Sequence, residues 1–290
     1  MPTMIDELLR GGPVVTDGAW GTQLQARGLP SGDCPDEWNL SHPDQVEEVP
    51  RAYVEAGSQI VLTNTFRANR LALAGCDLAE KTEEINRAGG EISLRAAGGQ
   101  ARVFGSIGPS GMMLLTGQVT EAELQDAFAQ QAEALAAAGV DALVIETMSD
   151  LAEAKLALAA AMATGLPVVA CMVFDSGKQL DRTMMGNTAE QIARELAAGG
   201  AAVIGANCGQ GIDSYVEVCR QLRGATDRPI WIKANAGVPE MDGDRVVYRT
   251  TPEGFGAHGP ALVEAGASFV GGCCGTGPEF IAALKRQINS

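Results

Sequence analysis

The sequence predicts a (β/α)8 barrel, and three observations lead to this fold class. Eight short apolar runs rich in β-branched residues alternate with helical patterns along the chain. Hydrophobic residues make up 46% of the chain but aromatic residues only 4%, which is typical of helix-covered parallel sheets built from Ala, Val, Leu and Ile. A chain of 290 residues fits one barrel of about 250 residues with loop insertions. We therefore expect a single barrel domain over residues 1–290.

Strand and helix signals alternate in order from one end of the chain to the other. Thr120 and Glu123 form a capping-box pattern, and Pro252 and Pro278 stand where a first helical position is expected. Gly ends a helical pattern just before the second, fourth, sixth and eighth strands. An open doubly wound sheet has the same alternation, but eight such units favour a barrel. The predicted strands are residues 13–16, 59–63, 101–106, 141–146, 167–173, 201–206, 229–234 and 268–271.

Charge and apolar patterning exclude several partners and locations. The chain has 36 acidic and 21 basic residues, and its net charge of -15 would repel nucleic acid and anionic lipid surfaces. Residues 157–174 carry no charge and have the length of a membrane span, but the segment 164–167 reads as a helix end followed by a strand. The amino terminus has no apolar stretch of signal-peptide length. We therefore expect a cytoplasmic protein with no membrane or nucleic-acid partner.

The longest connections follow the first, third, fifth and seventh predicted strands. In a barrel, loops after strands lie on the carboxyl-terminal face, where active sites of this fold occur. The sequence thus predicts an active site on that face. These connections are residues 17–43, 105–118, 175–186 and 235–249.

Three cysteines are predicted to meet on this face. Cys208 follows the sixth strand, and Cys273 and Cys274 follow the eighth. Barrel closure brings these strand ends to one rim. Three thiolates without a fourth protein ligand form the pattern of a catalytic zinc site with an open position. The alternative is a set of inert core thiols, but the glycines on both sides of Cys273 and Cys274 favour metal.

The other cysteines and the histidines lack such a context. We interpret Cys34, Cys76, Cys171 and Cys219 as structural, and the reducing compartment disfavours disulfides. The only histidines in the chain are His42 and His258, so histidine-rich metal sites and Ser-His-Asp catalysis are poorly supplied.

Two carboxylates also end apolar strands. Asp17 follows the first strand and Glu146 ends the fourth. Either one alone could cap the next loop, but two on the rim that carries the thiols favour a binding site for a cationic amine. Asn64, Thr65 and Asn235 add hydrogen-bonding groups on the same rim.

These motifs resemble the zinc-dependent homocysteine S-methyltransferase family over about residues 12–287. The match is similar both to bacterial betaine homocysteine methyltransferases and to the homocysteine-binding module of cobalamin-dependent methionine synthase. The segments that carry it are residues 17–22, 62–66, 145–149, 183–186, 207–209, 235–239 and 271–276.

The resemblance implies the roles of the site residues. It implies that Cys208, Cys273 and Cys274 bind Zn2+, that the sulfur of L-homocysteine takes the open position, and that Asp17 and Glu146 hold its amino group. The product would be methionine. The full set assigned to substrate binding is Asp17, Gly18, Asn64, Thr65, Glu146, Asn207 and Asn235.

The methyl donor is the least specified part of this reading. We expect a small onium compound, with betaine ahead of S-methylmethionine, and aromatic Trp20 and Trp38 as candidates to hold its cation. Arg67 disfavours a purely cationic donor, because its charge repels a cation unless Arg67 pairs with a carboxylate on the donor. The first alternative is a methylcorrinoid donor delivered by a separate corrinoid protein. A noncatalytic zinc-binding or thiol-redox barrel is the alternative of another class.

Overall fold

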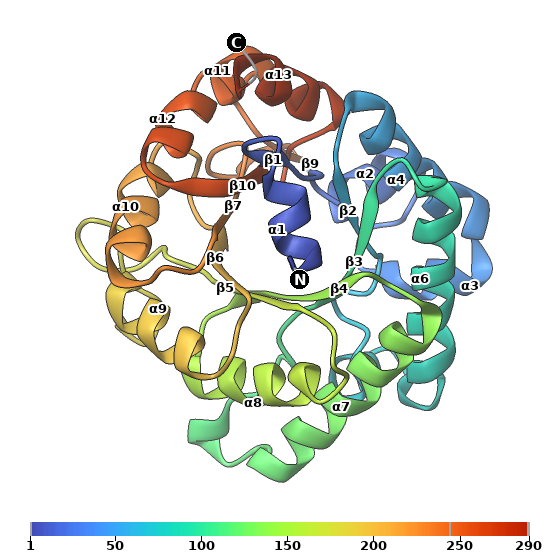
Figure 1. The fold of residues 1–290 in the computed structure, drawn as a ribbon. Coiled ribbons are helices and arrows are strands. Elements are labelled where there is room, and N and C mark those ends of the chain that lie inside the picture. The colour runs from blue at the N-terminus through green and yellow to red at the C-terminus, as the bar shows by residue number, and fades with distance from the viewer. Residues whose placement is uncertain (1, 244, 289–290) are drawn as a thin grey trace.

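Eight parallel strands surrounded by helices form the body of the protein (Figure 1). The structure is a computed structural model that describes residues 2–243 and 245–288. The strands lie in the order β1-β10-β7-β6-β5-β4-β3-β2. Their bounds are β1 (Val14–Val15), β2 (Ile60–Leu62), β3 (Arg102–Ile107), β4 (Ala142–Met148), β5 (Val168–Met172), β6 (Val203–Cys208), β7 (Ile230–Ala234) and β10 (Ala267–Gly272).

The two ends of this sheet meet, so the sheet is a barrel. Thr16 pairs with Ile60 in a parallel bridge between the ends of β1 and β2. The backbone N–H of Gln59 donates to the carbonyl of Val15 at 2.8 Å. The prediction of a (β/α)8 barrel rather than an open sheet is confirmed.

Helices cover the outside of the barrel and fill the connections (Figure 1). The α-helices are α1 (Met4–Leu9), α2 (Gly21–Ala26), α3 (Trp38–Ser41), α4 (Pro43–Ala56), α5 (Arg70–Ala74), α6 (Thr82–Ala97), α7 (Glu121–Ala138), α8 (Leu151–Met162), α9 (Ala189–Ala198), α10 (Tyr215–Ala225), α11 (Pro252–Gly256), α12 (Gly259–Glu264) and α13 (Pro278–Ile288). Short 3-10 turns are η1 (Pro35–Glu37), η2 (Ala79–Lys81) and η3 (Leu114–Thr116).

The helix boundaries follow from the local sequence. Thr120 accepts the backbone N–H of Glu123 while the Glu123 carboxylate accepts that of Thr120, so the predicted capping box begins α7. Gly139 ends this helix with φ +91°. Glycine suits this position because side-chain-bearing residues are strained at such angles.

Aromatic and aliphatic side chains fill the amino-terminal end of the barrel. Trp231 lies between Phe104 and Phe269, with ring centroids 6.1 and 5.3 Å away, and all three are fully buried. Helix α1 lies across this end, and its Ile5 packs into the same cluster (Figure 1). Because side chains occupy this end, the barrel can accommodate a ligand only toward its carboxyl-terminal face.

Two features of the carboxyl-terminal face differ from the sequence prediction. Strands β4 and β6 run two residues further than expected, so Cys208 is the last residue of β6 rather than the second residue beyond it. The connection after β7 contains an antiparallel hairpin, β8 (Glu240–Asp242) and β9 (Arg245–Val247), which the sequence did not reveal. Short hairpins of this kind have no long apolar pattern from which to recognise them.

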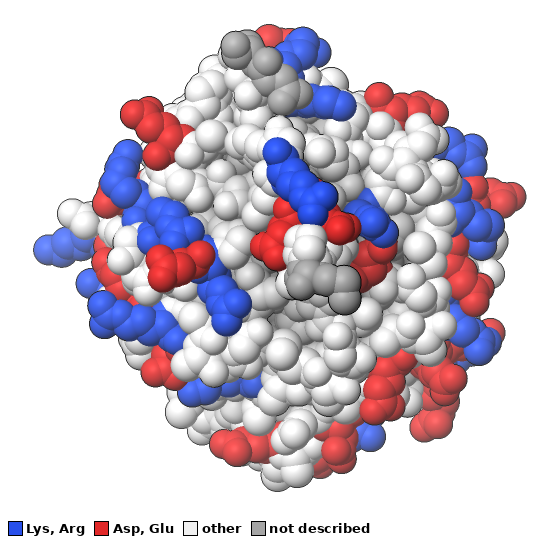
Figure 2. Space-filling model, in the orientation of Figure 1, with Lys and Arg blue, Asp and Glu red and all other residues white. Residues whose placement is uncertain are grey.

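The surface carries both signs of charge. On the amino-terminal face, acidic and basic side chains are interspersed around the helices (Figure 2). No helix among residues 2–243 and 245–288 is long and apolar enough to cross a membrane. The uncharged segment 157–174 is divided between the end of α8 and strand β5.

Candidate active site

The three predicted ligand thiols meet at one point on the carboxyl-terminal rim. The Sγ atoms of Cys208, Cys273 and Cys274 all lie within 4.8 Å of one another. Strands β6 and β10 bring them together because both flank β7: Cys208 pairs with Ala234, and the N–H of Cys273 donates to the Ala234 carbonyl at 2.7 Å. The sequence prediction that these thiols converge is correct.

An unusual backbone conformation aims Cys208 at the other two thiols. Its φ is +67°, which a residue with a side chain adopts only at a cost of about 1–3 kcal/mol. Hydrogen bonds from the Cys273 and Cys274 thiols lower the pKa of Cys208 to about 3. The arrangement therefore favours a thiolate at Cys208.

Two asparagines hold the thiol-bearing segments in place. Asn235 donates to the Cys208 sulfur at 3.6 Å and to the Gly209 carbonyl at 2.6 Å, while its own carbonyl accepts the N–H of Cys274 at 3.0 Å. Asn207 accepts the N–H of Thr147 at 2.7 Å and lies 3.9 Å from the Cys273 sulfur. Both predicted residues are thus part of the site, where they contact the backbone and the sulfurs.

A cavity of about 500 Å³ opens beside the thiols, within the usual range for small-molecule sites. It lies between the barrel interior, the loop after β1 and the β8–β9 hairpin. The residues that line it are Gly18, Ala19, Trp20, Gly21, Thr22, Gln25, Pro35, Asp36, Leu62, Thr63, Asn64, Phe66, Arg67, Ser106, Glu146, Thr147, Cys208, Lys233, Val246, Tyr248, Cys273 and Cys274.

Glu146 presents a carboxylate to this cavity. It lies at an irregularity of β4, where the register with β5 shifts between Ile145 and Met148. Ser106 donates to its Oε1 at 2.5 Å, and Asn207 lies 3.4 Å from its Oε2. Burial raises the pKa of Glu146, although the charge of Lys233 works in the opposite direction. Among the described residues, Ser106 and Asn207 are the side chains that donate to this carboxylate, so it can accept a further hydrogen bond from a ligand.

Asp17, the other predicted carboxylate, does not line the cavity. Its Oδ1 accepts a hydrogen bond from the Lys233 ammonium at 2.5 Å, and the two side chains are 0% and 2% exposed. Its Oδ2 accepts the N–H of Leu62 at 2.8 Å and the indole N–H of Trp20 at 3.2 Å. Both oxygens of Asp17 are therefore occupied by the protein, which distinguishes Asp17 from Glu146.

Gly18, Asn64 and Thr65 take different positions around the cavity. Gly18 lines it, and a Cβ there would lie 2.8 Å from both the Thr276 and Tyr53 hydroxyls, so only glycine fits. Asn64 also lines it and donates to the Pro35 carbonyl at 2.7 Å. Thr65 is fully buried behind the wall.

Aromatic rings surround the outer part of the cavity. Trp20 lines it, as predicted, together with Phe66 and Tyr248. Trp38 does not: it is 5% exposed and stacks on His42 with ring centroids 4.4 Å apart, so it belongs to the core. The Tyr248 ring lies against Gly275, where any Cβ would be 2.3 Å from the ring. Tyr248 thus lies against the residue after Cys274, a position that the sequence did not predict.

Arg67 lines the same outer region beside a buried acid. Its backbone N–H donates to Oδ1 of Asp36 at 3.0 Å, and its side chain is exposed. Asp36 is 2% exposed, and burial raises its pKa to about 6. The cavity is therefore lined by two acidic and two basic residues: the buried Glu146, Lys233 and Asp36, and the exposed Arg67.

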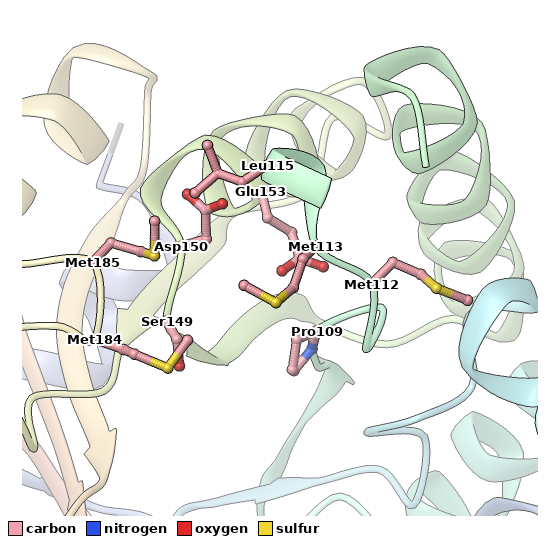
Figure 3. A pocket seen from close by; sticks show the side chains of 9 residues that line it. All are labelled: Pro109, Met112, Met113, Leu115, Ser149, Asp150, Glu153, Met184 and Met185. Atoms are coloured by element: carbon pink, nitrogen blue, oxygen red, sulfur yellow. The ribbon is translucent and has the colours of Figure 1, made fainter. Parts of the chain in front are cut away.

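A second hollow on the same rim is small and has a different character. Figure 3 shows Met113 and Met184 turned toward each other across it. It measures about 70 Å³ and lies among the loops after β3, β4 and β5. Nearby Ser110 donates its hydroxyl to Glu153 at 2.6 Å, so this loop is held by internal contacts. The hollow is too small for an amino acid substrate.

The remaining cysteines lie away from the thiol cluster. Cys171 and Cys219 are buried, and burial raises the pKa of both, that of Cys219 to about 12. Cys34 is half-buried. Cys76 is exposed, so burial gives no support to the structural role expected for it.

Lys233, Asp36 and Tyr248 are among the cavity residues that the sequence did not predict. A signal existed for Lys233, because it is the only charged residue in an otherwise apolar strand and a buried charge needs a partner. Asp36 and Tyr248 lie in long connections with no periodic pattern. Their place in the cavity depends on how those connections fold.

Comparison with solved structures supports the fold. The homocysteine methyltransferase MmuM from Escherichia coli superposes with a TM-score of 0.80 in its metallated form, at 24% identity over 95% of this chain and 96% of that one. Its oxidised form gives a TM-score of 0.83 at 23% identity, over 98% and 100% of the two chains. At this level of identity the likeness concerns the barrel itself.

Sequence comparison identifies the family. Methionine synthase from Mycobacterium tuberculosis is 32% identical over 95% of this chain, and that from Mycobacterium leprae is 31% identical over the same share. The chain spans 24% of the length of each of these relatives. The family model described as homocysteine S-methyltransferase matches residues 14–288, which contain the thiols and every residue that lines the cavity. The chain therefore belongs to the homocysteine S-methyltransferase family of enzymes.

Proposed function

We propose that this protein transfers a methyl group from a small onium compound to the sulfur of L-homocysteine and so forms methionine. The observation that carries the proposal is the meeting of three thiols at the edge of a cavity that also presents a carboxylate and a cation. Family membership supports homocysteine as the acceptor. The cavity volume suits two small molecules held side by side.

The donor set fits zinc. Three sulfurs lie within 4.8 Å of one another, and no fourth His, Cys, Asp or Glu joins them among the described residues. This is the ligand set of a zinc site that keeps one position for substrate. Cys208, Cys273 and Cys274 would hold the ion, which when bound favours the thiolate over the thiol of homocysteine at neutral pH.

The residues of this chain supply positioning. Glu146 accepts a hydrogen bond from the homocysteine ammonium, and Asn207 and Asn235 keep the thiol-bearing segments in register. The substrate sulfur attacks the methyl carbon in line. A new S–C bond forms as the bond between the methyl group and the donor atom breaks, and its electron pair stays with the donor. No base or covalent intermediate on the protein is needed, because positioning and exclusion of water suffice.

The aromatic lining of the cavity suits an onium donor. Trp20, Phe66 and Tyr248 line the cavity, and the faces of aromatic rings attract methylated cations. The exposed Arg67 guanidinium can hold a carboxylate on the same donor. A zwitterion such as betaine matches both features, and S-methylmethionine matches the sulfonium and carboxylate in the same way.

A methylcorrinoid protein is the second candidate donor. The rim exposes apolar side chains of Met113, Leu115, Met184 and Val246, which a docked partner would cover. This chain aligns with 24% of the length of the methionine synthase from Mycobacterium tuberculosis. That partial match is compatible with delivery of the methyl group by another module.

A donor panel tests the proposal. Zinc-loaded protein and homocysteine are incubated with betaine, with S-methylmethionine, or with a methylcorrinoid protein, and methionine is quantified by mass spectrometry. We expect turnover with one of the two small donors alone. Turnover only with the corrinoid protein supports the second candidate. Zinc binding without homocysteine affinity or methionine formation overturns the proposal and leaves a noncatalytic zinc barrel.

A further inference from the structure

Lys233 is a buried cation that faces the cavity beside the thiols. Its side chain is 2% exposed, yet it lines the cavity. Strand β7 places it one residue before Ala234, to which both thiol-bearing strands pair. It therefore lies between β6 and β10, and its side chain lines the same cavity as the three thiols.

The ammonium group of Lys233 keeps unused donors. Lysine has three N–H donors, and among the described residues the hydrogen bond to Oδ1 of Asp17 is the one that its Nζ makes. Asp17 keeps this ammonium in place, since its other oxygen is fixed by the Leu62 N–H and the Trp20 indole. An ammonium group that is held in place at a cavity and has N–H donors without a protein partner can bind an anion without moving.

Glu146 and Lys233 together match an amino acid head group. In homocysteine the ammonium and carboxylate branch from one carbon atom, so their partners on the protein must be close together and opposite in charge. Glu146 and Lys233 line the same cavity and are near enough for each to shift the other's pKa. Asp36 and Arg67, which also line the cavity, are left for the donor.

We infer that Lys233 binds the carboxylate of homocysteine and thereby selects an α-amino acid thiol over a simple aminothiol. This inference rests on the proposed function and names the residue that would give it substrate specificity. Asp17 then acts as a positioning residue for Lys233 rather than as the partner of the substrate ammonium, which leaves that task to Glu146.

Two truncated substrates separate binding of the carboxylate from binding of the ammonium. Aminopropanethiol is homocysteine without its carboxylate, and mercaptobutyrate is homocysteine without its ammonium. Dissociation constants of all three thiols are measured by calorimetry on zinc-loaded protein. We expect wild-type protein to prefer homocysteine over either analogue by about tenfold to a hundredfold, the value of one charge-assisted hydrogen bond.

Substitutions should then remove one preference at a time. Lys233→Met should abolish the preference over aminopropanethiol and keep the preference over mercaptobutyrate, whereas Glu146→Gln should do the reverse. Lys155→Met, at an exposed ion pair with Glu195, is the matched control and should change neither. The double variant Asp17→Asn, Lys233→Met removes both buried charges and repeats the test if Lys233→Met alone fails to fold.

Each outcome has a distinct meaning. If the Lys233 variants weaken homocysteine and aminopropanethiol to the same extent, Lys233 is merely structural and the inference is overturned while the proposed function stands. If wild-type protein neither binds nor methylates homocysteine, the proposed function itself fails.

Discussion

The buried ion pair between Asp17 and Lys233 should make a measurable contribution to stability. Lys233→Met removes the cation and leaves the Asp17 carboxylate, 0% exposed, with two of its three donors. Breaking a buried pair from one side costs about 3–5 kcal/mol. Because the Leu62 N–H and Trp20 indole remain, we expect the lower end of this range.

The expected change in melting temperature follows from the size of the chain. An unfolding entropy of about 2.1 cal/mol/K per residue over 290 residues gives about 0.6 kcal/mol/K. A loss of about 3 kcal/mol therefore lowers Tm by about 5 °C. The double variant Asp17→Asn, Lys233→Met should recover more than half of this loss, since no buried charge is left unpaired.

Differential scanning calorimetry of wild-type protein, Lys233→Met, Asp17→Asn and the double variant measures these values as a double-mutant cycle. If Lys233→Met melts within about 1 °C of wild type, an effect below about 1 kcal/mol, the ion pair does not make the expected contribution to stability. If the double variant loses the sum of the two single losses, the two side chains are energetically independent and the expected coupling is absent.

Four further predictions concern the site. Cys273→Ala should lower zinc from about one ion per chain to a trace and abolish transfer, while circular dichroism stays that of a folded barrel; metal analysis that still finds one ion contradicts this. Glu146→Gln should weaken homocysteine binding about tenfold to a hundredfold without loss of zinc, and equal binding in both proteins would exclude an ammonium contact. Arg67→Ala should raise the KM of a carboxylate-bearing donor in steady-state kinetics and leave homocysteine binding unchanged. If the donor is a corrinoid protein, the substitution should instead change the salt dependence with which that protein associates with the barrel. Asp36 has a folded pKa of about 6, above its ordinary value, so its ionisation destabilises the native state as pH rises through 6. The Tm of Asp36→Asn minus that of wild type should therefore grow between pH 4 and pH 8. A constant Tm difference would contradict the assignment of Asp36 as a buried acid.

The fold and the thiol cluster could be predicted from the sequence because both depend on local signals and on topology. Apolar runs indicate the eight strands, and glycine-ended helices precede four of them. Closure of eight units brings the ends of β6 and β10 to one rim. Once Cys208, Cys273 and Cys274 are placed at those ends, their meeting follows from strand order. Glu146, expected on this rim because it ends the fourth strand, does line the cavity.

The partners of each charge were decided only by the tertiary structure. Asp17 and Glu146 look alike in the sequence, each at the end of an apolar strand. Lys233 lies 216 residues from Asp17, and within the described part of the chain its ammonium group donates to Asp17 and not to Glu146. The sequence likewise does not distinguish Trp20 from Trp38, which lie in the same long connection. In the structure, Trp38 stacks on His42 in the core, whereas Trp20 lines the cavity. Local sequence determines where a backbone segment runs, whereas the direction of a side chain and the partner of a buried charge depend on packing between segments far apart in the chain.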